Sequence, residues 1–189
     1  MHVRDYFAGF AFLFLTTGLQ AEPTEYAVDP AHSSVGFKIS HMGLAWVHGR
    51  FDDFAGEFKV DPEDPSQSTF MMSIKTDSID TNNKKRDDHL RSAEFLNVKE
   101  FPVMTFQSRT VKAVDGGLEI TGDLTLHGMT NPVTLSLKGG KMTEFPRGTH
   151  RTGYSTDLVL KRSNYGMNTM VGPIGDDVHV SISFEGVKK

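Results

Sequence analysis

The densest group of reactive side chains lies between residues 84 and 89, where three basic residues precede Asp-Asp-His. Lys85 and Arg86, with Arg162 further along the chain, could bind a phosphate or a quinone oxygen through charge-assisted hydrogen bonds. The Asp-Asp-His run could act as a general acid and base. The simpler interpretation is a solvated basic patch followed by the start of a helix, whose amides favour acidic residues. We take Lys85, Arg86 and Arg162 as candidates for contact with a polar head group.

Catalytic and metal-binding patterns are weak in the rest of the sequence. The chain has eight histidines and no cysteine, and no two histidines are four residues apart, the spacing that brings two ligands onto one helix face. The Gly-x-Ser-x-Gly motif of hydrolases is also missing. We therefore expect a binding protein rather than an enzyme, with no catalytic residue, metal or cofactor. Hydrolysis of a lipid ester remains an alternative.

Composition predicts one globular domain. Of the 189 residues, 38% are hydrophobic and 23% are charged, and the net charge is -4. This balance leaves no basic excess to neutralise a phosphate backbone, so nucleic acid is not an expected partner. A homodimer is left open.

The N-terminus has the order of a secretory signal peptide. Arg4 precedes an apolar run over residues 6–15, and the small residue Ala21 is followed by Glu22 and Pro23. The apolar run is about half of the ~20 residues that span a bilayer, so a permanent anchor is the weaker alternative. We predict a signal peptide over residues 1–21 and a mature, secreted domain over residues 22–189 that is not an integral membrane protein.

From residue 24 onward, apolar and polar residues alternate with a period of two, which is typical of antiparallel strands with one wet face. Turns are predicted at Asp115–Gly117, at Gly128 and at Asn131–Pro132. Residues 82–92 break the alternation and predict a short helix, capped by Asn82 or Asn83, that lies over the strands like a lid. The fold class is therefore all-β, a sandwich or a barrel. We favour an antiparallel, lipocalin-like barrel of about eight strands, because closure removes exposed edges.

The inward positions of this barrel are rich in phenylalanine and methionine, of which the chain has 14 and 9. Methionine adapts to irregular space, and barrels of this size have room for one small ligand. Ordinary core packing is the alternative, because periodicity cannot distinguish a filled barrel from an occupied one. The predicted pocket lining consists of Val35, Phe37, Ile39, Phe54, Phe58, Met72, Ile74, Phe95, Phe106, Ile120, Leu124, Leu135, Tyr154, Leu158, Val180, Ile182 and Phe184.

Several short strings resemble the YceI-like family, in the family's order, from about residue 25 to 186. The first is Tyr26–Ser33 (YAVDPAHS), followed by the strings VGF at 35–37, HMG at 41–43, GRF at 49–51, SIDT at 78–81, RDDHL at 86–90, FLNV at 95–98, FPVMTF at 101–106 and GDLTLHGMT at 122–130. Two departures keep an apolar side chain, at Leu96 and at Met129. The pocket shape is therefore less certain than the fold.

The resemblance implies a lipocalin-like barrel, exported to the bacterial periplasm, whose long pocket takes polyisoprenoid chains. From it we expect a periplasmic carrier for an isoprenoid lipid or quinone, such as a polyprenyl phosphate. The alternatives are a quinone-linked accessory of an electron-transfer partner and a lipid-ester hydrolase. The hydrophobic small-molecule ligand is the expected partner.

Overall fold

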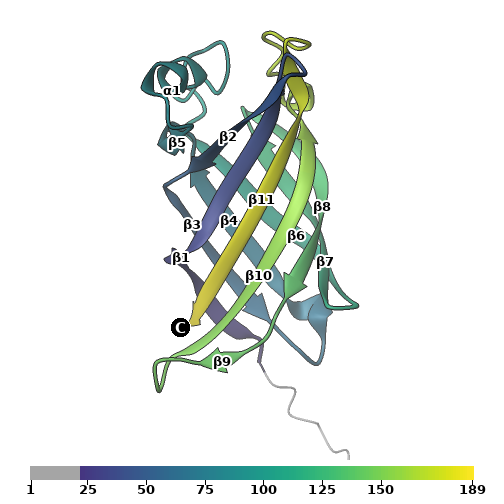
Figure 1. The fold of residues 1–189 in the computed structure, drawn as a ribbon. Coiled ribbons are helices and arrows are strands. Elements are labelled where there is room, and N and C mark those ends of the chain that lie inside the picture. Colours follow the sequence, from purple (N-terminus) through teal and green to yellow (C-terminus); the bar gives the residue numbers. More distant parts are fainter. Residues whose placement is uncertain (1–21) are drawn as a thin grey trace, which may run out of the picture.

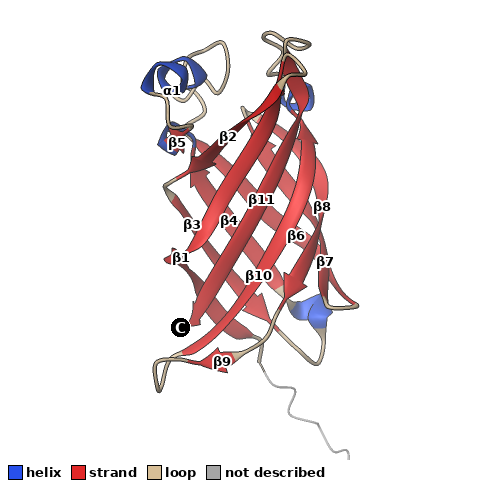
Figure 2. Cartoon of the chain, viewed as in Figure 1, coloured by secondary structure: helices blue, strands red, loops and turns tan. Residues whose placement is uncertain are grey.

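The protein is a closed antiparallel barrel of eight strand positions, as predicted (Figures 1 and 2). The computed structural model describes residues 22–189, and the predicted signal peptide at residues 1–21 lies outside the described residues. The strands are β1 (Thr24–His41), β2 (Ala45–Phe51), β3 (Phe54–Val60), β4 (Thr69–Lys75), β5 (Ile79–Asp80), β6 (Val103–Val114), β7 (Gly117–Leu126), β8 (Met129–Gly139), β9 (Thr143–Glu144), β10 (His150–Lys161) and β11 (Ile174–Lys188). The helices are α1 (Lys84–Leu90) and three 3-10 turns, η1 (Pro65–Gln67), η2 (Thr76–Ser78) and η3 (Arg162–Tyr165).

The strand order around the barrel is β1, β3, β4, β6, β7, β8, β10 and β11, and β11 pairs with β1 to close the sheet. The 18-residue β1 is long enough to serve two neighbours on its other edge. Its first residues pair with β3 and its last with β2, so β2 and β3 together occupy one strand position. Closure leaves no free edge along β1 or β11, which removes a route to aggregation.

The helix predicted over residues 82–92 is confirmed as α1, which lies at the end of the barrel opposite the C-terminus (Figure 1). Asn83 caps it by accepting a hydrogen bond from the amide of Arg86. Asp87 is buried and accepts hydrogen bonds from the amide and the hydroxyl of Thr81. This carboxylate therefore holds α1 against the segment that follows β5.

The turn between β7 and β8 confirms the prediction at Gly128 but not the one at Asn131–Pro132. His127 and Gly128 both have positive φ angles, of 51° and 72°, as a two-residue hairpin turn requires. Asn131 and Pro132, predicted as a turn, instead lie inside β8. Counted from the hairpin turn, Pro132 faces β7 at a non-hydrogen-bonded position, so its nitrogen points toward β10. The β8–β10 ladder has only two paired positions, so proline costs no ladder bond there.

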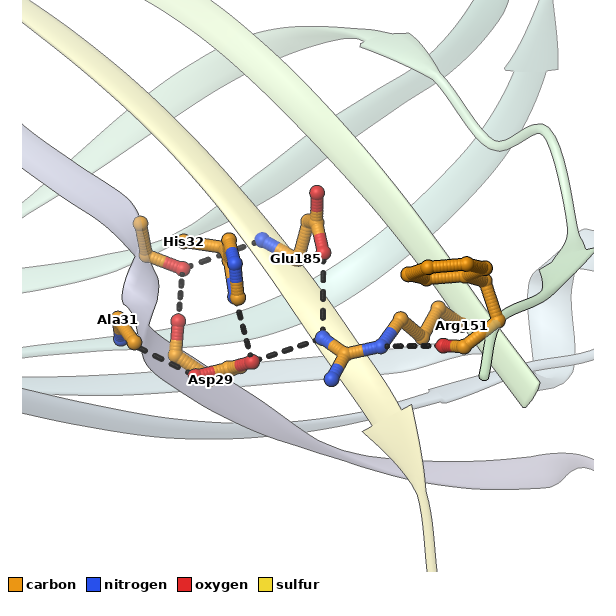
Figure 3. Close-up of polar contacts among 7 residues, drawn as sticks. Asp29, Ala31, His32, Arg151 and Glu185 are labelled. Carbon is orange, nitrogen blue, oxygen red and sulfur yellow. Dashed lines mark hydrogen bonds and ion pairs between the residues drawn. The ribbon is translucent and has the colours of Figure 1, made fainter. Parts of the chain in front are cut away.

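A network of ion pairs joins β1 to β10 and β11 at the point where β1 has a bulge (Figure 3). Asp29 Oδ2 lies 2.7 Å from Arg151 Nη1 and 2.9 Å from His32 Nδ1. The same Arg151 nitrogen lies 3.3 Å from Glu185 Oε2. The Ser33 hydroxyl donates to the carbonyl of Asp29 and accepts from the amide of Glu185. The Asp-x-x-His-Ser string of the sequence thus acts as a structural clasp on the barrel wall.

This clasp predicts a specific loss of stability in acid. Hydrogen bonds from Arg151 and, with a smaller effect, from His32 lower the pKa of the Asp29 carboxyl to about 2. A carboxyl with a depressed folded-state pKa stabilises the fold above its unfolded pKa of about 4, and this contribution is lost as the pH falls through about 2. Urea midpoints measured between pH 5 and pH 2 should therefore fall more steeply for the natural protein than for Asp29→Asn. Parallel curves for the two proteins would contradict this assignment.

Candidate apolar ligand site

An aromatic core fills the end of the barrel that contains the C-terminus. Phe58 lies at its centre, with ring centroids 5.1 Å from Tyr26, 5.4 Å from Phe70 and 5.4 Å from Phe184. Tyr154 covers the same group edge-on. All five side chains are buried. Large aromatic rings packed in this way close one end of the barrel, so that any hollow must lie toward α1.

Above this core the barrel contains a cavity of about 760 Å³. This volume lies within the range of small-molecule pockets. The wall is almost entirely carbon, and the inward side chains of β2 and β3 contribute to it together with those of β1, β4, β6, β7, β8, β10 and β11. The mouth lies between α1 on one side and the residue 167–174 loop on the other, because both segments contribute to the lining. Such a hollow favours an apolar guest over water.

All but two of the side chains predicted to line the pocket border this cavity. They are Val35, Phe37, Ile39, Phe58, Met72, Ile74, Phe95, Phe106, Ile120, Leu124, Leu135, Leu158, Val180, Ile182 and Phe184. Tyr154 points inward but lies in the aromatic core below the cavity, and Phe54 is buried at the start of β3 without reaching it. Alternation gives the direction of a side chain and not its height in the barrel.

Sequence reasoning missed two kinds of lining residue. Leu160 and Val178 continue the inward alternation of β10 and β11 toward the mouth, so the same signal could have included them. Met167, Met170 and Ile174 come from the loop between η3 and β11 and from its junction with β11. An irregular segment has no period from which their direction could be read.

Lys85 and Arg86 lie at the mouth, where both border the cavity. Arg86 is hydrogen-bonded to Thr81, which lies between β5 and α1. Its Nε donates to Thr81 Oγ1 and its Nη2 to the Thr81 carbonyl, each at 2.7 Å. Its Nη1 has no hydrogen-bond partner among residues 22–189, and Lys85 has no ion pair there. These groups therefore offer positive charge to a ligand without first having to break a contact.

Arg162 also borders the cavity, but its donors are already committed. It is 4% exposed and donates to the carbonyl oxygens of Met167, Thr169, Ile174 and Gly175 at 2.7 to 3.2 Å. Burial lowers the pKa of its guanidinium, although arginine stays charged. Four of its five N–H groups are thus used to hold the rim loop, and one remains for a ligand.

The cavity wall offers little to a catalytic mechanism. Thr156 is the one hydroxyl of the wall that is both buried and without a hydrogen-bond partner in the described chain. A nucleophile needs a base within hydrogen-bond reach, and Thr156 Oγ1 has none. Within residues 22–189 no group of three or more His, Asp or Glu side chains is placed to hold a metal ion. Among the described residues, the cavity wall therefore has no buried hydroxyl that is paired with a base.

Comparison with known proteins places the chain in a family. The family model for the YceI-like domain matches residues 26–186. A protein named YceI from Salmonella agona is 43% identical over 182 residues, which cover 95% of each chain, and one from Salmonella arizonae is 43% identical over 181 residues, which cover 95% of this chain and 94% of that one.

Solved structures agree with the fold. BcnA of Burkholderia cenocepacia aligns with a TM-score of 0.77 at 23% identity, covering 84% of this chain and 98% of that one. A structure described as a polyisoprenoid binding domain from Saccharophagus degradans aligns with a TM-score of 0.69 at 16% identity, covering 89% and 100%. In the described part of this chain, no helix has the length and apolarity needed to cross a bilayer. The chain belongs to the YceI-like family.

Proposed function

We propose that this protein is a periplasmic carrier that holds one long isoprenoid lipid, a polyprenyl phosphate or a quinone, inside its barrel. The observation that carries this proposal is the carbon-walled cavity of about 760 Å³, open at the end that bears α1. The description of the Saccharophagus degradans domain as polyisoprenoid binding supports the same ligand class. Export rests on the predicted signal peptide at residues 1–21.

The apolar tail is the main source of affinity in this proposal. Each buried methylene contributes about 0.8 kcal/mol, so about ten of them offer roughly 8 kcal/mol before the cost of ordering the chain. An exposed ion pair at the mouth adds only about 0 to 1 kcal/mol. Lys85 and Arg86 therefore orient the head group toward the mouth, while the tail lies between Phe106 and Leu158 deeper in the barrel.

Native mass spectrometry of protein purified from a bacterial host tests the proposal. We expect a fraction of the protein to carry one extra mass that denaturation releases, and organic extraction should recover an isoprenoid. A redox-active species in the extract would identify the cargo as a quinone, whereas phosphorus would identify a polyprenyl phosphate. Protein that is empty, and that also fails to take up added isoprenoids, would overturn the carrier function.

A further inference from the structure

Exposed apolar side chains gather at the mouth of the cavity. The turn between β1 and β2 presents Met42 and Leu44, which are 60% and 82% exposed. Beside it, the loop before β11 presents Met170 and Val171, also exposed. The amide of Met42 donates to the carbonyl of Pro173 at 2.6 Å, so the two segments form one unit, visible at the α1 end of the barrel (Figure 1). We call these four residues the apolar rim.

The backbone of the apolar rim is unfavourable for the residues it carries. Met42 and Met170 have positive φ angles of 55° and 54°. Residues other than glycine, asparagine and aspartate seldom adopt this backbone region. Each methionine therefore carries a conformational cost and, in water, the cost of its own exposure. Exposed apolar groups that persist in this way mark an interaction surface.

Charges of both signs lie near the apolar rim. Asp176 and Asp177 follow the loop on β11, where both pair with Lys161. On the other side of the rim, Lys38 lies on β1, the strand that leads to the Met42–Leu44 turn. Lys38 Nζ lies 5.0 Å from the ring centroid of Trp46, which is half-exposed on the outer face of β2. Tryptophan and lysine next to exposed leucine and methionine match the interface between lipid head groups and acyl chains.

We propose that the apolar rim docks the protein onto a lipid bilayer, so that the cavity mouth faces the membrane. This proposal rests on the proposed carrier function, because a membrane is where an isoprenoid chain is dissolved. Met170 of the rim and the nearby Ile174 both border the cavity, so a chain leaving the bilayer there enters an apolar wall without crossing water. Lys38 and Trp46 then lie at the level of the lipid head groups.

The sole tryptophan of the chain provides a local probe of this contact. Addition of vesicles of phosphatidylethanolamine and phosphatidylglycerol should shift Trp46 emission to the blue, and brominated lipids should quench it. The double variant Met42→Ser/Leu44→Ser should bind these vesicles at least about tenfold more weakly in co-sedimentation, since full burial of one leucine alone is worth about that factor.

The opposite end of the barrel supplies a matched control. Met142 and Phe145 are 60% and 74% exposed near β9, far from the mouth (Figure 1). Met142→Ser/Phe145→Ser should leave vesicle binding unchanged. Equal loss in both double variants, or no Trp46 shift with the natural protein, would overturn the docking proposal, and a rim that captures a protein instead of vesicles would do the same.

Lipid uptake from detergent solution separates the two proposals. If the natural protein takes up an isoprenoid from detergent but ignores vesicles, docking is wrong and the carrier function stands. If the rim variant still loads from detergent but loads at least tenfold more slowly from vesicles, docking is supported. Failure of the natural protein to load from either source overturns the carrier function itself.

Discussion

Replacing Val180 by glutamate should abolish lipid binding while the barrel stays folded. Val180 is half-buried on β11, and its Cα partners are Phe37 on β1 and Leu158 on β10, all three of which border the cavity. In the empty cavity water can hydrate the new carboxylate. An apolar ligand would displace this water and offer no hydrogen bond to the carboxylate. Binding would therefore bury an unpaired charge, which costs several kcal/mol. A cost of about 3 kcal/mol weakens binding by more than a hundredfold.

The matched control is Ser155→Glu, which adds the same charge to the outer face of β10, beside Lys138. Titration with an isoprenoid, followed by native mass spectrometry, should give an unchanged affinity for this variant. Circular dichroism should report the same barrel for both proteins. If Val180→Glu bound the lipid as tightly as Ser155→Glu, the ligand would have to lie outside the cavity.

Replacing Arg162 by methionine should cause the largest loss of stability of any single change at the mouth. The substitution leaves the carbonyl oxygens of Met167, Thr169, Ile174 and Gly175 without their donor. Loss of these charge-assisted bonds costs about 3 kcal/mol, since hydrogen bonds to charged groups are each worth about 1.5–3 kcal/mol and they do not add fully. For a chain of this length, that lowers the melting temperature by about 10 °C.

Two companion variants test this interpretation of Arg162. Lys161→Met removes the neighbouring exposed charge and its ion pair with Asp177, and should change the melting temperature by only a degree or two. Arg162→Lys keeps the charge but cannot reach four carbonyl groups from one nitrogen, so it should restore only part of the loss. If Arg162→Lys kept the full melting temperature, the positive charge alone, and not the several donors of the guanidinium, would stabilise the loop.

The barrel itself could be predicted because each strand exposes one face to water and turns the other toward the interior. Phe37 and Ile39, or Val180 and Ile182, alternate with polar neighbours, and this period fixes which side chains point inward. The helix could be predicted because residues 82–92 lack that period and begin with asparagine, and Asn83 is its cap. These features are local, so the sequence carries them directly.

The extent of the cavity could not be predicted, because it depends on how far the core fills the barrel. Tyr154 and Leu158 both point inward from β10, yet the first packs against Phe58 and the second borders the hollow. The difference is one of height and of ring volume, which alternation does not encode. The rim loop was missed for another reason: Arg162 fixes it through main-chain carbonyls, and these leave no trace in the order of side chains.

A crystal structure of the protein saturated with a polyprenyl phosphate is the most direct measurement of where the ligand lies. The account predicts continuous electron density for one chain that runs from the mouth, with its head group near Lys85, down between Leu158 and Phe106 to the aromatic core around Phe58. Ordered water in that space, or a lipid bound to the outer wall over an empty cavity, would contradict it.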